Sequence, residues 1–201
     1  MESFPIFINL KKKPVTVIGG GDIALRKVRL LIKADPKITV ISRQICKDLK
    51  ELLIEYDYKI LEKSFNESDL ETPILIIAAT NNAKTNKRIS TYAQQKNILI
   101  NVVDQPKLCT FTMGSIVERD SLVVSISSGG KAPVLVRKIR ERIEALLPQS
   151  YSELVRFSGN LRSMVKKKIQ SGVKRRIFWE EFFESDYIQN FILIPKKLDL
   201  R

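Results

Sequence analysis

The residues of this chain that could do chemistry begin with a glycine-rich turn near the N-terminus. Residues 19–24 read Gly-Gly-Gly-Asp-Ile-Ala and follow an apolar run, 14–18, that is typical of a β-strand. The spacing G-x-G-x-x-A between a strand and a helix predicts a dinucleotide-binding turn, in which Gly19 allows the bend and Gly21 lets the backbone approach a pyrophosphate. The N–H groups at the start of the helix would then face the phosphates. A tight turn that binds nothing is the alternative.

The residues that would read the ribose of the nucleotide follow the second expected strand, 37–41. An Asp or Glu is typical there, about 20 residues past the glycine turn, but this chain has Ser42, Arg43 and Gln44. Arg43 would suit the 2′-phosphate of NADP, whereas Ser42 and the local backbone could serve the ribose of NAD. These residues therefore leave the choice between NAD and NADP open.

A second candidate for chemistry is Asp104, which follows the expected strand 98–103. Ligands of open parallel sheets bind at the carboxyl ends of the strands, so Asp104 would lie at the right edge. The chain contains no histidine, which excludes His-based triads and the usual acid–base residue at neutral pH. A carboxylate near a nicotinamide is then the best candidate for proton transfer. An Asp that caps the turn before Pro106 is an equal alternative.

A second glycine-rich loop, Ser127-Ser128-Gly129-Gly130-Lys131, precedes an amphipathic segment that we expect to be helical from Pro133 to about Leu147. Backbone N–H groups, two hydroxyls and a lysine ahead of a helix are suited to an anion, and a substrate carboxylate is the expected ligand. An ordinary hinge into the helix is the alternative.

The elements that must position these residues alternate between strand and helix from about residue 14 to 104. Alternation of this kind predicts an α/β fold with a parallel sheet and helical crossovers, in this case a Rossmann domain. The expected strands are 14–18, 37–41, 58–61, 74–79 and 98–103, and the expected helices are 22–34, 45–55 and 82–95. After Pro106 two strands, 111–117 and 122–126, predict a hairpin with a turn at 118–121. Helices are expected from about residue 150 onward.

The composition is that of an ordinary globular protein with an excess of positive charge. The 201 residues carry a formal net charge of +13, which attracts nucleic acid, an anionic membrane or a polyanionic substrate, or only aids solubility. The two cysteines, Cys46 and Cys109, match no C-x-x-C pattern, and we expect both to be small, buried or half-buried residues. No apolar run reaches the ~20 residues that cross a bilayer, and no signal peptide is evident. We expect a cytoplasmic protein with no membrane partner and no metal site.

Five segments, in order, resemble the precorrin-2 dehydrogenase family, which includes the N-terminal half of sirohaem synthases. They are VIGGGDIALRKVRLL at 17–31, IAATNN at 77–82, NVVDQPKLCTF at 101–111, VSISSGGKAPVLVRKIRERIEALLP at 124–148 and RRIFWEEFF at 175–183. The resemblance implies a Rossmann domain over 1–110, a hairpin-plus-helix dimerisation segment over 111–148, a small helical C-terminal domain over 149–201, and a homodimer. Two departures, Gly114 and the pair Cys109-Thr110, lie near the hinge into the dimerisation segment.

The resemblance also implies a reaction and a set of site residues. The reaction is the NAD-dependent oxidation of precorrin-2 to sirohydrochlorin in sirohaem biosynthesis, and some members also insert ferrous iron. Asp104 matches the catalytic Asp of the family. The positions expected to bind the cofactor are Gly19, Gly21, Asp22, Ile23, Arg43, Gln44 and Thr80, and those expected at the substrate are Ser128, Gly129 and Lys131. Relatives use NAD without an acid after the second strand, so the resemblance favours NAD. Another protein is expected to supply the methylated substrate.

The resemblance also implies a role for the positive net charge. A tetrapyrrole of the precorrin-2 type carries eight carboxylates, which a basic cleft would attract. Further candidates for this contact are Lys131, Arg137, Lys138, Arg140, Lys166, Lys167 and Lys168. The alternative function is a basic nucleic-acid-binding module that keeps a nucleotide-sensing Rossmann domain. It requires exposed aromatic residues among basic ones, whereas the aromatics at 178–183 recur at a spacing typical of a helical core. We therefore expect no nucleic acid partner.

Overall fold

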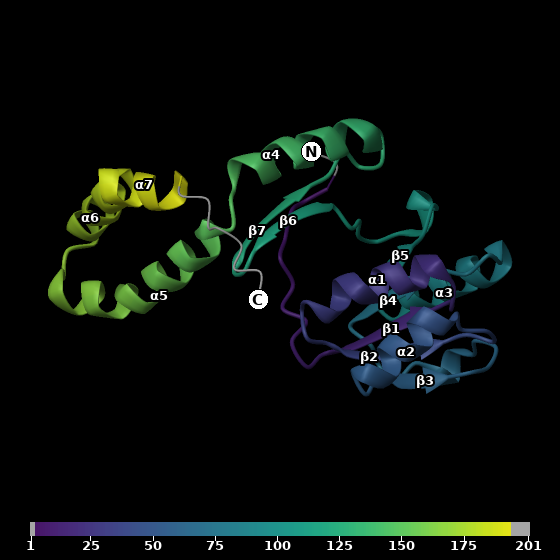
Figure 1. Cartoon of the computed structure of the whole chain (residues 1–201). Coiled ribbons are helices and arrows are strands. Elements are labelled where there is room, and N and C mark those ends of the chain that lie inside the picture. The colour runs from purple at the N-terminus through teal and green to yellow at the C-terminus, as the bar shows by residue number, and fades with distance from the viewer. Residues whose placement is uncertain (1–2, 194–201) are drawn as a thin grey trace. The chain divides into compact units, whose positions relative to one another are not determined.

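The structure is a computed structural model that describes residues 3–193 (Figure 1). The chain divides into two compact units between Met113 and Gly114, and each unit is described by itself. The strands of the first unit are β1 (Pro14–Ile18), β2 (Lys37–Ile41), β3 (Lys59–Leu61), β4 (Leu75–Ala78) and β5 (Leu99–Val102). Its α-helices are α1 (Asp22–Ile32), α2 (Lys47–Glu55) and α3 (Ala83–Gln95), and short 3-10 turns lie at Glu67–Asp69 and Pro106–Leu108.

The five strands form one parallel sheet in the order β3-β2-β1-β4-β5. The chain builds outward from β1 through β2 to β3, then returns to the other side of β1 to form β4 and β5. The order therefore reverses between β1 and β4, and in open α/β sheets a reversal of this kind leaves a crevice at the carboxyl ends of the strands. The predicted Rossmann-type α/β fold is confirmed.

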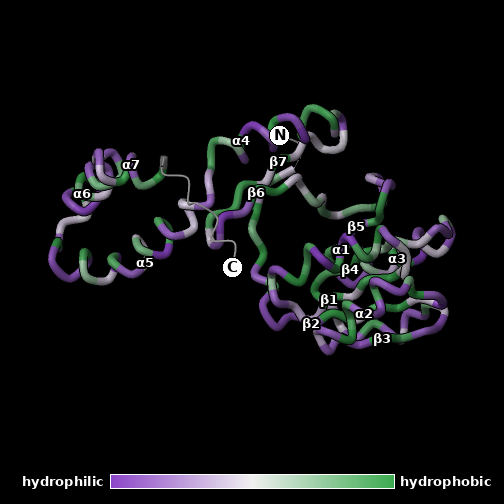
Figure 2. The backbone as a smooth tube through the Cα atoms, in the orientation of Figure 1, coloured by the Kyte–Doolittle hydropathy of each residue, from purple (hydrophilic) through white to green (hydrophobic). Residues whose placement is uncertain are grey.

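Strand β4 shows why the sequence forms this sheet. All its residues are buried, as expected for an apolar run in a parallel strand covered on both faces. Leu75 and Ile77 pack in the cluster that includes α1 and α2, whereas Ile76 and Ala78 pack in the cluster that includes α3. The two-residue period of the strand thus supplies both cores, and the hydrophobic colour follows the strands of this unit in Figure 2.

The first strand of the hairpin is present, but its expected start at residue 111 is wrong, because residues 111–113 belong to the first unit. The Thr110 backbone N–H donates to the Ile100 carbonyl at 2.9 Å, and the Asn101 side-chain amide donates to the Phe111 carbonyl at 3.1 Å. These bonds hold residues 110–111 against β5, so the hairpin begins only at Ser115. The turn is correspondingly shorter than expected, at Asp120-Ser121.

The second unit opens with the predicted hairpin, in which β6 (Ser115–Arg119) pairs antiparallel with β7 (Leu122–Ile126). Four helices follow in the described residues: α4 (Pro133–Leu146), α5 (Ser150–Lys168), α6 (Gly172–Glu184) and α7 (Asp186–Leu193). Arg119 is buried and binds the end of α4, because its Nε donates to the Leu147 carbonyl at 2.5 Å and its guanidinium also donates to the Glu144 carbonyl at 3.2 Å. A cation among the last carbonyls of a helix stabilises that end.

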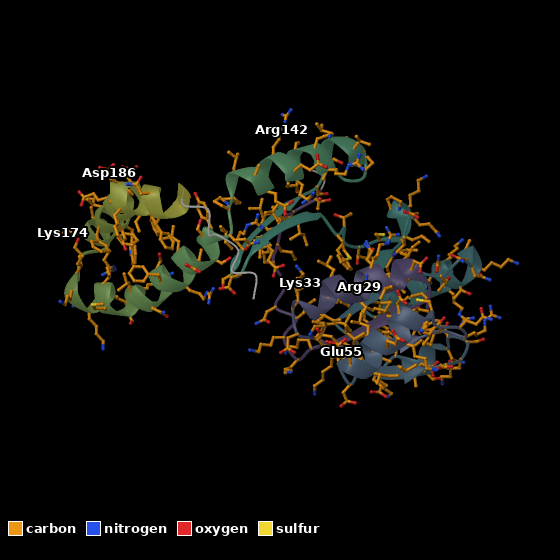
Figure 3. The ribbon with its side chains drawn as sticks, viewed as in Figure 1. Arg29, Lys33, Glu55, Arg142, Lys174 and Asp186 are labelled. Carbon is orange, nitrogen blue, oxygen red and sulfur yellow. The ribbon has the colours of Figure 1, made fainter. Side chains whose placement is uncertain are left out.

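Aromatic side chains of α6 pack on one another and on α5. Phe182 lies 6.2 Å from Phe157 and 5.6 Å from Trp179 between ring centroids. The rings contact one another as their helical spacing predicts, but the core expected from that spacing is not formed within the described residues: Phe178, Trp179 and Phe182 are only half-buried, and Phe157 and Phe183 are 51% and 39% exposed. Charged side chains that Figure 3 labels, such as Arg29, Arg142 and Lys174, occupy exposed positions. Within residues 3–193, no helix has both the length and the apolar character needed to cross a membrane.

Candidate functional site

The carboxyl edge of the parallel sheet gathers the predicted site residues of the first unit. Gly19 to Gly21 follow β1, Ser42 to Gln44 follow β2, Thr80 follows β4 and Asp104 follows β5. Parallel strands end at the same edge, so segments more than 80 positions apart in sequence meet there. The structure thereby brings Gly19, Gly21, Asp22, Ile23, Arg43, Gln44, Thr80 and Asp104 to one edge of the sheet.

The glycine turn fits between two neighbouring strands. Gly19 has a φ of +125°, and a Cβ added to it would lie 2.7 Å from the carbonyl carbon of Ala79, at the end of β4. Gly20 is equally confined, because an added Cβ would lie 2.9 Å from the Gln44 carbonyl carbon. Gly21 has no atom within 4 Å of such a Cβ. The first two glycines are therefore required by packing, while the third faces open space.

The N-terminus of α1 lies directly behind this open space. Gly21 is the N-cap residue, and no side chain caps the helix. The first N–H groups of the helix are therefore available to an anion, and the positive end of the helix dipole favours one. Ala24 is fully buried and lets α1 pack on the sheet, as predicted. A dinucleotide pyrophosphate fits the turn, with Gly21 at the point of approach.

The segment after β2 is tied to the glycine turn by backbone bonds. The Cys46 N–H donates to the Gly20 carbonyl at 2.7 Å, and the Gly19 N–H donates to the Ile41 carbonyl at 2.9 Å. The Ser42 hydroxyl donates to the Gln44 carbonyl at 2.7 Å, so its lone pairs remain as acceptors. Arg43 and Gln44 are exposed. This segment could hold a ribose beside the phosphates.

Thr80 is fixed by an asparagine that the sequence does not single out. The Thr80 hydroxyl bonds to Asn86 Oδ1 at 2.6 Å, and Asn86 Nδ2 donates to the Thr80 carbonyl at 3.0 Å. Asn86 is only 2% exposed. Asn82 caps α3, because its side-chain oxygen accepts the Thr85 N–H at 2.9 Å. The pair Asn-Asn before a helical segment could have predicted this cap from the sequence. The end of β4 is thereby held rigidly.

Asp104 is exposed and lies in a turn of left-handed backbone, with a φ of +57°. The turn is closed by Cys109, whose Sγ accepts the Val102 N–H at 3.1 Å and lies 3.2 Å from the Val102 carbonyl and 3.4 Å from the Gln105 carbonyl. Cys109 is half-buried, as expected, and free, but its thiol also has a polar role that the sequence did not suggest. It fixes both sides of the turn that presents the carboxylate.

Lys27, on α1, shares the surroundings of Asp104 and was not predicted. It is half-buried, and its Nζ donates to Met113 Sδ at 3.5 Å. Burial lowers the pKa of Lys27, and the charge of Arg26 lowers it further, whereas the charges of Asp104 and Cys109 act in the opposite direction. The contact joins residues 86 positions apart, so no local pattern indicates it.

The second glycine loop belongs to the second unit. Its hydroxyls accept hydrogen bonds within the loop: Ser127 Oγ from the Gly129 N–H at 3.2 Å, and Ser128 Oγ from the Ala132 N–H at 3.0 Å. Lys131 is exposed. Because a hydroxyl that accepts can still donate its hydrogen, Ser128 keeps one donor for an anion. The roles of Ser128, Gly129 and Lys131 at a substrate stay predictions.

The other predicted cations of this unit are partly neutralised. Arg137 and Lys138 both pair with Glu141, at 3.9 and 3.4 Å, and Arg140 pairs with Glu144. Exposed pairs of this kind on a helix are weak, and they reduce the local field that these cations present. Lys166, Lys167 and Lys168 form the last turn of α5, where positive charge is favourable.

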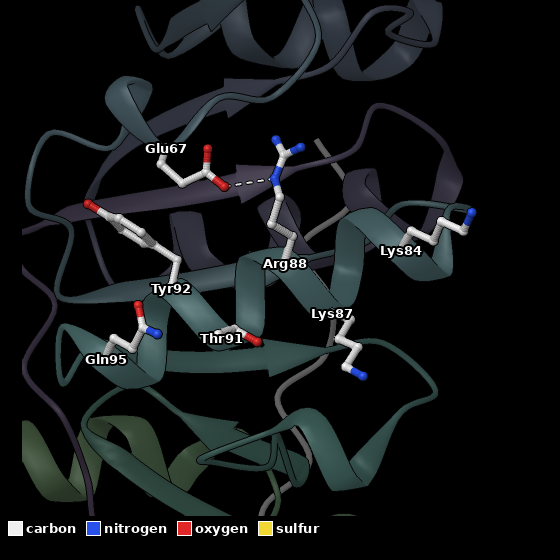
Figure 4. Close-up of a pocket in the computed structure, with 7 residues that line it drawn as sticks. All are labelled: Glu67, Lys84, Lys87, Arg88, Thr91, Tyr92 and Gln95. Atoms are coloured by element: carbon white, nitrogen blue, oxygen red, sulfur yellow. Dashed lines mark ion pairs between the residues drawn. The ribbon is translucent and has the colours of Figure 1, made fainter.

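A pocket of about 420 Å³ lies along α3 (Figure 4). It is lined by Glu67, Lys84, Lys87, Arg88, Thr91, Tyr92 and Gln95. Arg88 is already engaged there: its Nε pairs with Glu67 at 2.7 Å, and its guanidinium donates to the Phe65 carbonyl at 2.8 Å. None of the predicted site residues lines this pocket.

Comparison with known families assigns three consecutive segments. Residues 6–115 match a family described as "Putative NAD(P)-binding", residues 119–146 match "Sirohaem biosynthesis protein central", and residues 150–191 match "Sirohaem synthase dimerisation region". The dimerisation match falls on α5 to α7, the helices that the sequence assigns to a C-terminal domain. The division into domains at 110 and 148 stays a prediction.

Curated relatives resemble most of this chain. It is 48% identical over 183 residues to a siroheme synthase of Vesicomyosocius okutanii and 39% identical over 192 residues to one of Buchnera aphidicola, covering 91% and 96% of this chain. These matches cover 39% and 41% of the relatives, so the chain spans about two fifths of their length.

Among solved structures, "SirC, precorrin-2 dehydrogenase" has the same fold, with a TM-score of 0.76, 22% identity, and coverage of 94% of this chain and 92% of that one. The match over residues 6–115 takes in more than half of the 201 residues. This match, together with the open glycine turn where the strand order reverses, establishes that the chain belongs to the family described as "Putative NAD(P)-binding".

Proposed function

We propose that this chain is an NAD-dependent dehydrogenase that oxidises precorrin-2 to sirohydrochlorin. The observation that carries the proposal is the placement of Asp104 at the same sheet edge as an open glycine turn. The extensive identity to siroheme synthases and the fold shared with a precorrin-2 dehydrogenase support the choice of substrate.

Each segment of the edge has a task in this reaction. The glycine turn and the uncapped start of α1 hold the pyrophosphate, the residues from Ser42 to Gln44 hold the ribose, and Thr80 borders the nicotinamide. NAD, when bound, accepts the hydride that leaves the substrate. Asp104 accepts the proton that leaves with it, so the substrate loses two electrons and two hydrogens in all. No histidine is needed, because a carboxylate beside the substrate can act as the base.

An anaerobic assay tests the reaction directly. The full chain is mixed with precorrin-2 and NAD, and NADH and sirohydrochlorin are measured as they form in equal amounts. A parallel series with NADP tests the cofactor, and we expect NAD to be preferred. If NADH does not rise above the level without enzyme, the proposed function is wrong.

Asp104→Asn tests the base. Asn tolerates left-handed backbone, so the turn should persist while the proton acceptor is lost. Turnover should fall about 10²- to 10⁴-fold, with NAD affinity unchanged. Asp57→Asn is a matched control, because Asp57 is also exposed with a φ of +53° but lies between α2 and β3, at the opposite end of the strands. Equal turnover in both variants would make Asp104 a structural residue.

Insertion of ferrous iron into sirohydrochlorin stays a second prediction. The metal replaces two pyrrole N–H protons, and the exposed Asp104 carboxylate could accept a proton. Sirohydrochlorin mixed with ferrous or cobaltous ion, without NAD, tests this activity separately from the dehydrogenase. A rate equal to that of the metal ion without protein would contradict it.

We also propose that the chain forms a homodimer through its second unit. The match of residues 150–191 to a dimerisation region supports this assembly, and sedimentation of the full chain measures it. A monomer at micromolar concentration would contradict it. A cytoplasmic location also stays a prediction, to be tested by cell fractionation.

A further inference from the structure

Lys27 is placed between α1 and the segment that follows β5. Its neighbours on the helix, Ala24 and Val28, are fully buried against the sheet, so Lys27 lies at the flank of the packed face. Side chains on a helix lean toward its N-terminus, which for α1 is the end that carries the glycine turn. The contact of Nζ with Met113 Sδ directs the ammonium to the side of the sheet where the chain leaves β5.

The ammonium of Lys27 is poorly satisfied by the described chain. It has three donors, and its hydrogen bond goes to a thioether, which is a weak acceptor. Within residues 3–193, no carboxylate lies within the 4.0 Å of an ion pair with its Nζ. Asp104 acts on it only through its charge from a greater distance. A partly buried charge without a close partner reduces stability, and such costs are typical of functional sites.

Burial and a neighbouring positive charge both disfavour the charged form of Lys27. Burial lowers its pKa, and the neighbouring Arg26 lowers it further. A carboxylate that entered beside it would supply the missing hydrogen bond and the opposite charge at once. An anion bound by Lys27 would lie within reach of the charge of Asp104, on the side of the first unit where the chain leaves β5.

We propose that Lys27 binds one carboxylate of the tetrapyrrole substrate and so places the macrocycle beside Asp104. The inference rests on the proposed function and specifies one of its contacts. Lys27 differs in this from the exposed lysines and arginines of the chain, which attract the substrate from a distance. Its position beside the base makes it a determinant of which part of the macrocycle reacts.

Binding of a non-reacting octacarboxylate tests the inference without turnover. Uroporphyrin is titrated into the full-length wild type, Lys27→Met and Arg26→Met, and its dissociation constant is measured from its absorbance. Arg26 is the matched control, because it is the adjacent, exposed cation on the same helix and its loss changes the net charge equally. Lys27→Met should weaken uroporphyrin binding about tenfold or more, as expected for a charge-assisted hydrogen bond. Arg26→Met should change binding less than about twofold, as expected for a screened surface charge.

Further measurements separate the binding role from the other roles that Lys27 could have. The KM for precorrin-2 should rise in Lys27→Met by a similar factor, with the affinity for NAD unchanged and Lys27→Arg partly restoring binding. The melting temperature should not fall, because the cost of the buried ammonium is removed. Weaker NAD binding would make Lys27 a phosphate contact, and a shifted pH profile of kcat with unchanged KM would make it a modulator of Asp104. Either result would overturn the proposal.

The two proposals can fail separately. If the wild type binds uroporphyrin and Lys27→Met does not, while no NADH forms from precorrin-2, the carboxylate site stands and the dehydrogenase function is wrong. If the wild type turns over but Lys27→Met and Arg26→Met bind uroporphyrin equally, the function stands and the role of Lys27 is wrong. If the wild type neither turns over nor binds uroporphyrin, both are overturned.

Discussion

The turn at Gly19–Gly21 and the turn at Ser128–Gly130 both join a strand to a helix, but their glycines meet different surroundings. Side chains at Gly19 and Gly20 would overlap the backbone of neighbouring segments, whereas a side chain at Gly130 would meet nothing within 4 Å. Gly130 is special only in its φ of +82°. The first turn is therefore fixed by the strands around it, and the second by its own backbone conformation.

The helices that follow the two turns, α1 and α4, also differ in how many free N–H groups their N-termini offer. Neither α1 nor α4 has a side-chain cap. The first N–H groups of α1 face open space, whereas α4 begins at Pro133, which has no N–H, and the Ala132 N–H is bound by Ser128 Oγ. The first turn thus offers more donors to an anion than the second. A glycine-rich loop before a helix is therefore not sufficient evidence for an anion site, because the loop can satisfy its own donors.

Gly19→Ala should have the largest effect on stability. Overlap with Ala79 and the φ of +125° each cost about 1–3 kcal/mol, so we expect a loss of about 2–6 kcal/mol. Hydrogen exchange at the β1 amides measures it, because unfolding of the first unit exposes them. Gly159→Ala is the control: an added Cβ there has open space within α5 of the second unit, so exchange at the β1 amides should not change, while exchange at the α5 amides should slow by the equivalent of about 0.5–1 kcal/mol. A loss of less than about 1 kcal/mol in Gly19→Ala would show that the turn relaxes.

Much of the first unit could be predicted because its signals are local. The strands at 14–18 and 37–41 have the predicted bounds, since each is a short apolar run between polar or glycine-rich segments. The residues placed at the carboxyl edge follow from the same reasoning, because the carboxyl ends of parallel strands meet at one edge. The predicted roles of these residues await the variants proposed above.

The features that could not be predicted depend on contacts between distant segments. Lys27 meets Met113, and Arg119 meets the end of α4, through bonds that no local spacing indicates. Gly20 was passed over because its reason lies in the carbonyl of Gln44, in another loop. Cys109 was expected to act only as a small, buried or half-buried residue, whereas its thiol also bonds to the backbone around Asp104. In each case the missing information is which other part of the chain lies opposite the residue.

Gly21→Ala should separate binding from stability in the first turn. Its φ of −93° suits any residue, and an added Cβ meets nothing, so stability should change by less than about 1 kcal/mol. The same Cβ would occupy the space that a pyrophosphate needs, so the dissociation constant of NAD should rise about tenfold or more. Calorimetric titration with NAD measures this change. Unchanged affinity would mean that the dinucleotide does not lie against Gly21.

Gly130→Ala should cost less stability than Gly19→Ala, because only the backbone conformation opposes it. A non-glycine residue in left-handed backbone costs about 1–2 kcal/mol, and no packing cost is added here. Gly130→Asn should recover part of this loss, because Asn tolerates such a φ. Urea unfolding followed by fluorescence of Trp179, which lies in the second unit, measures both variants. A loss in Gly130→Ala as large as that in Gly19→Ala would mean that the second loop is also confined by packing, as it would be if a partner subunit covered it.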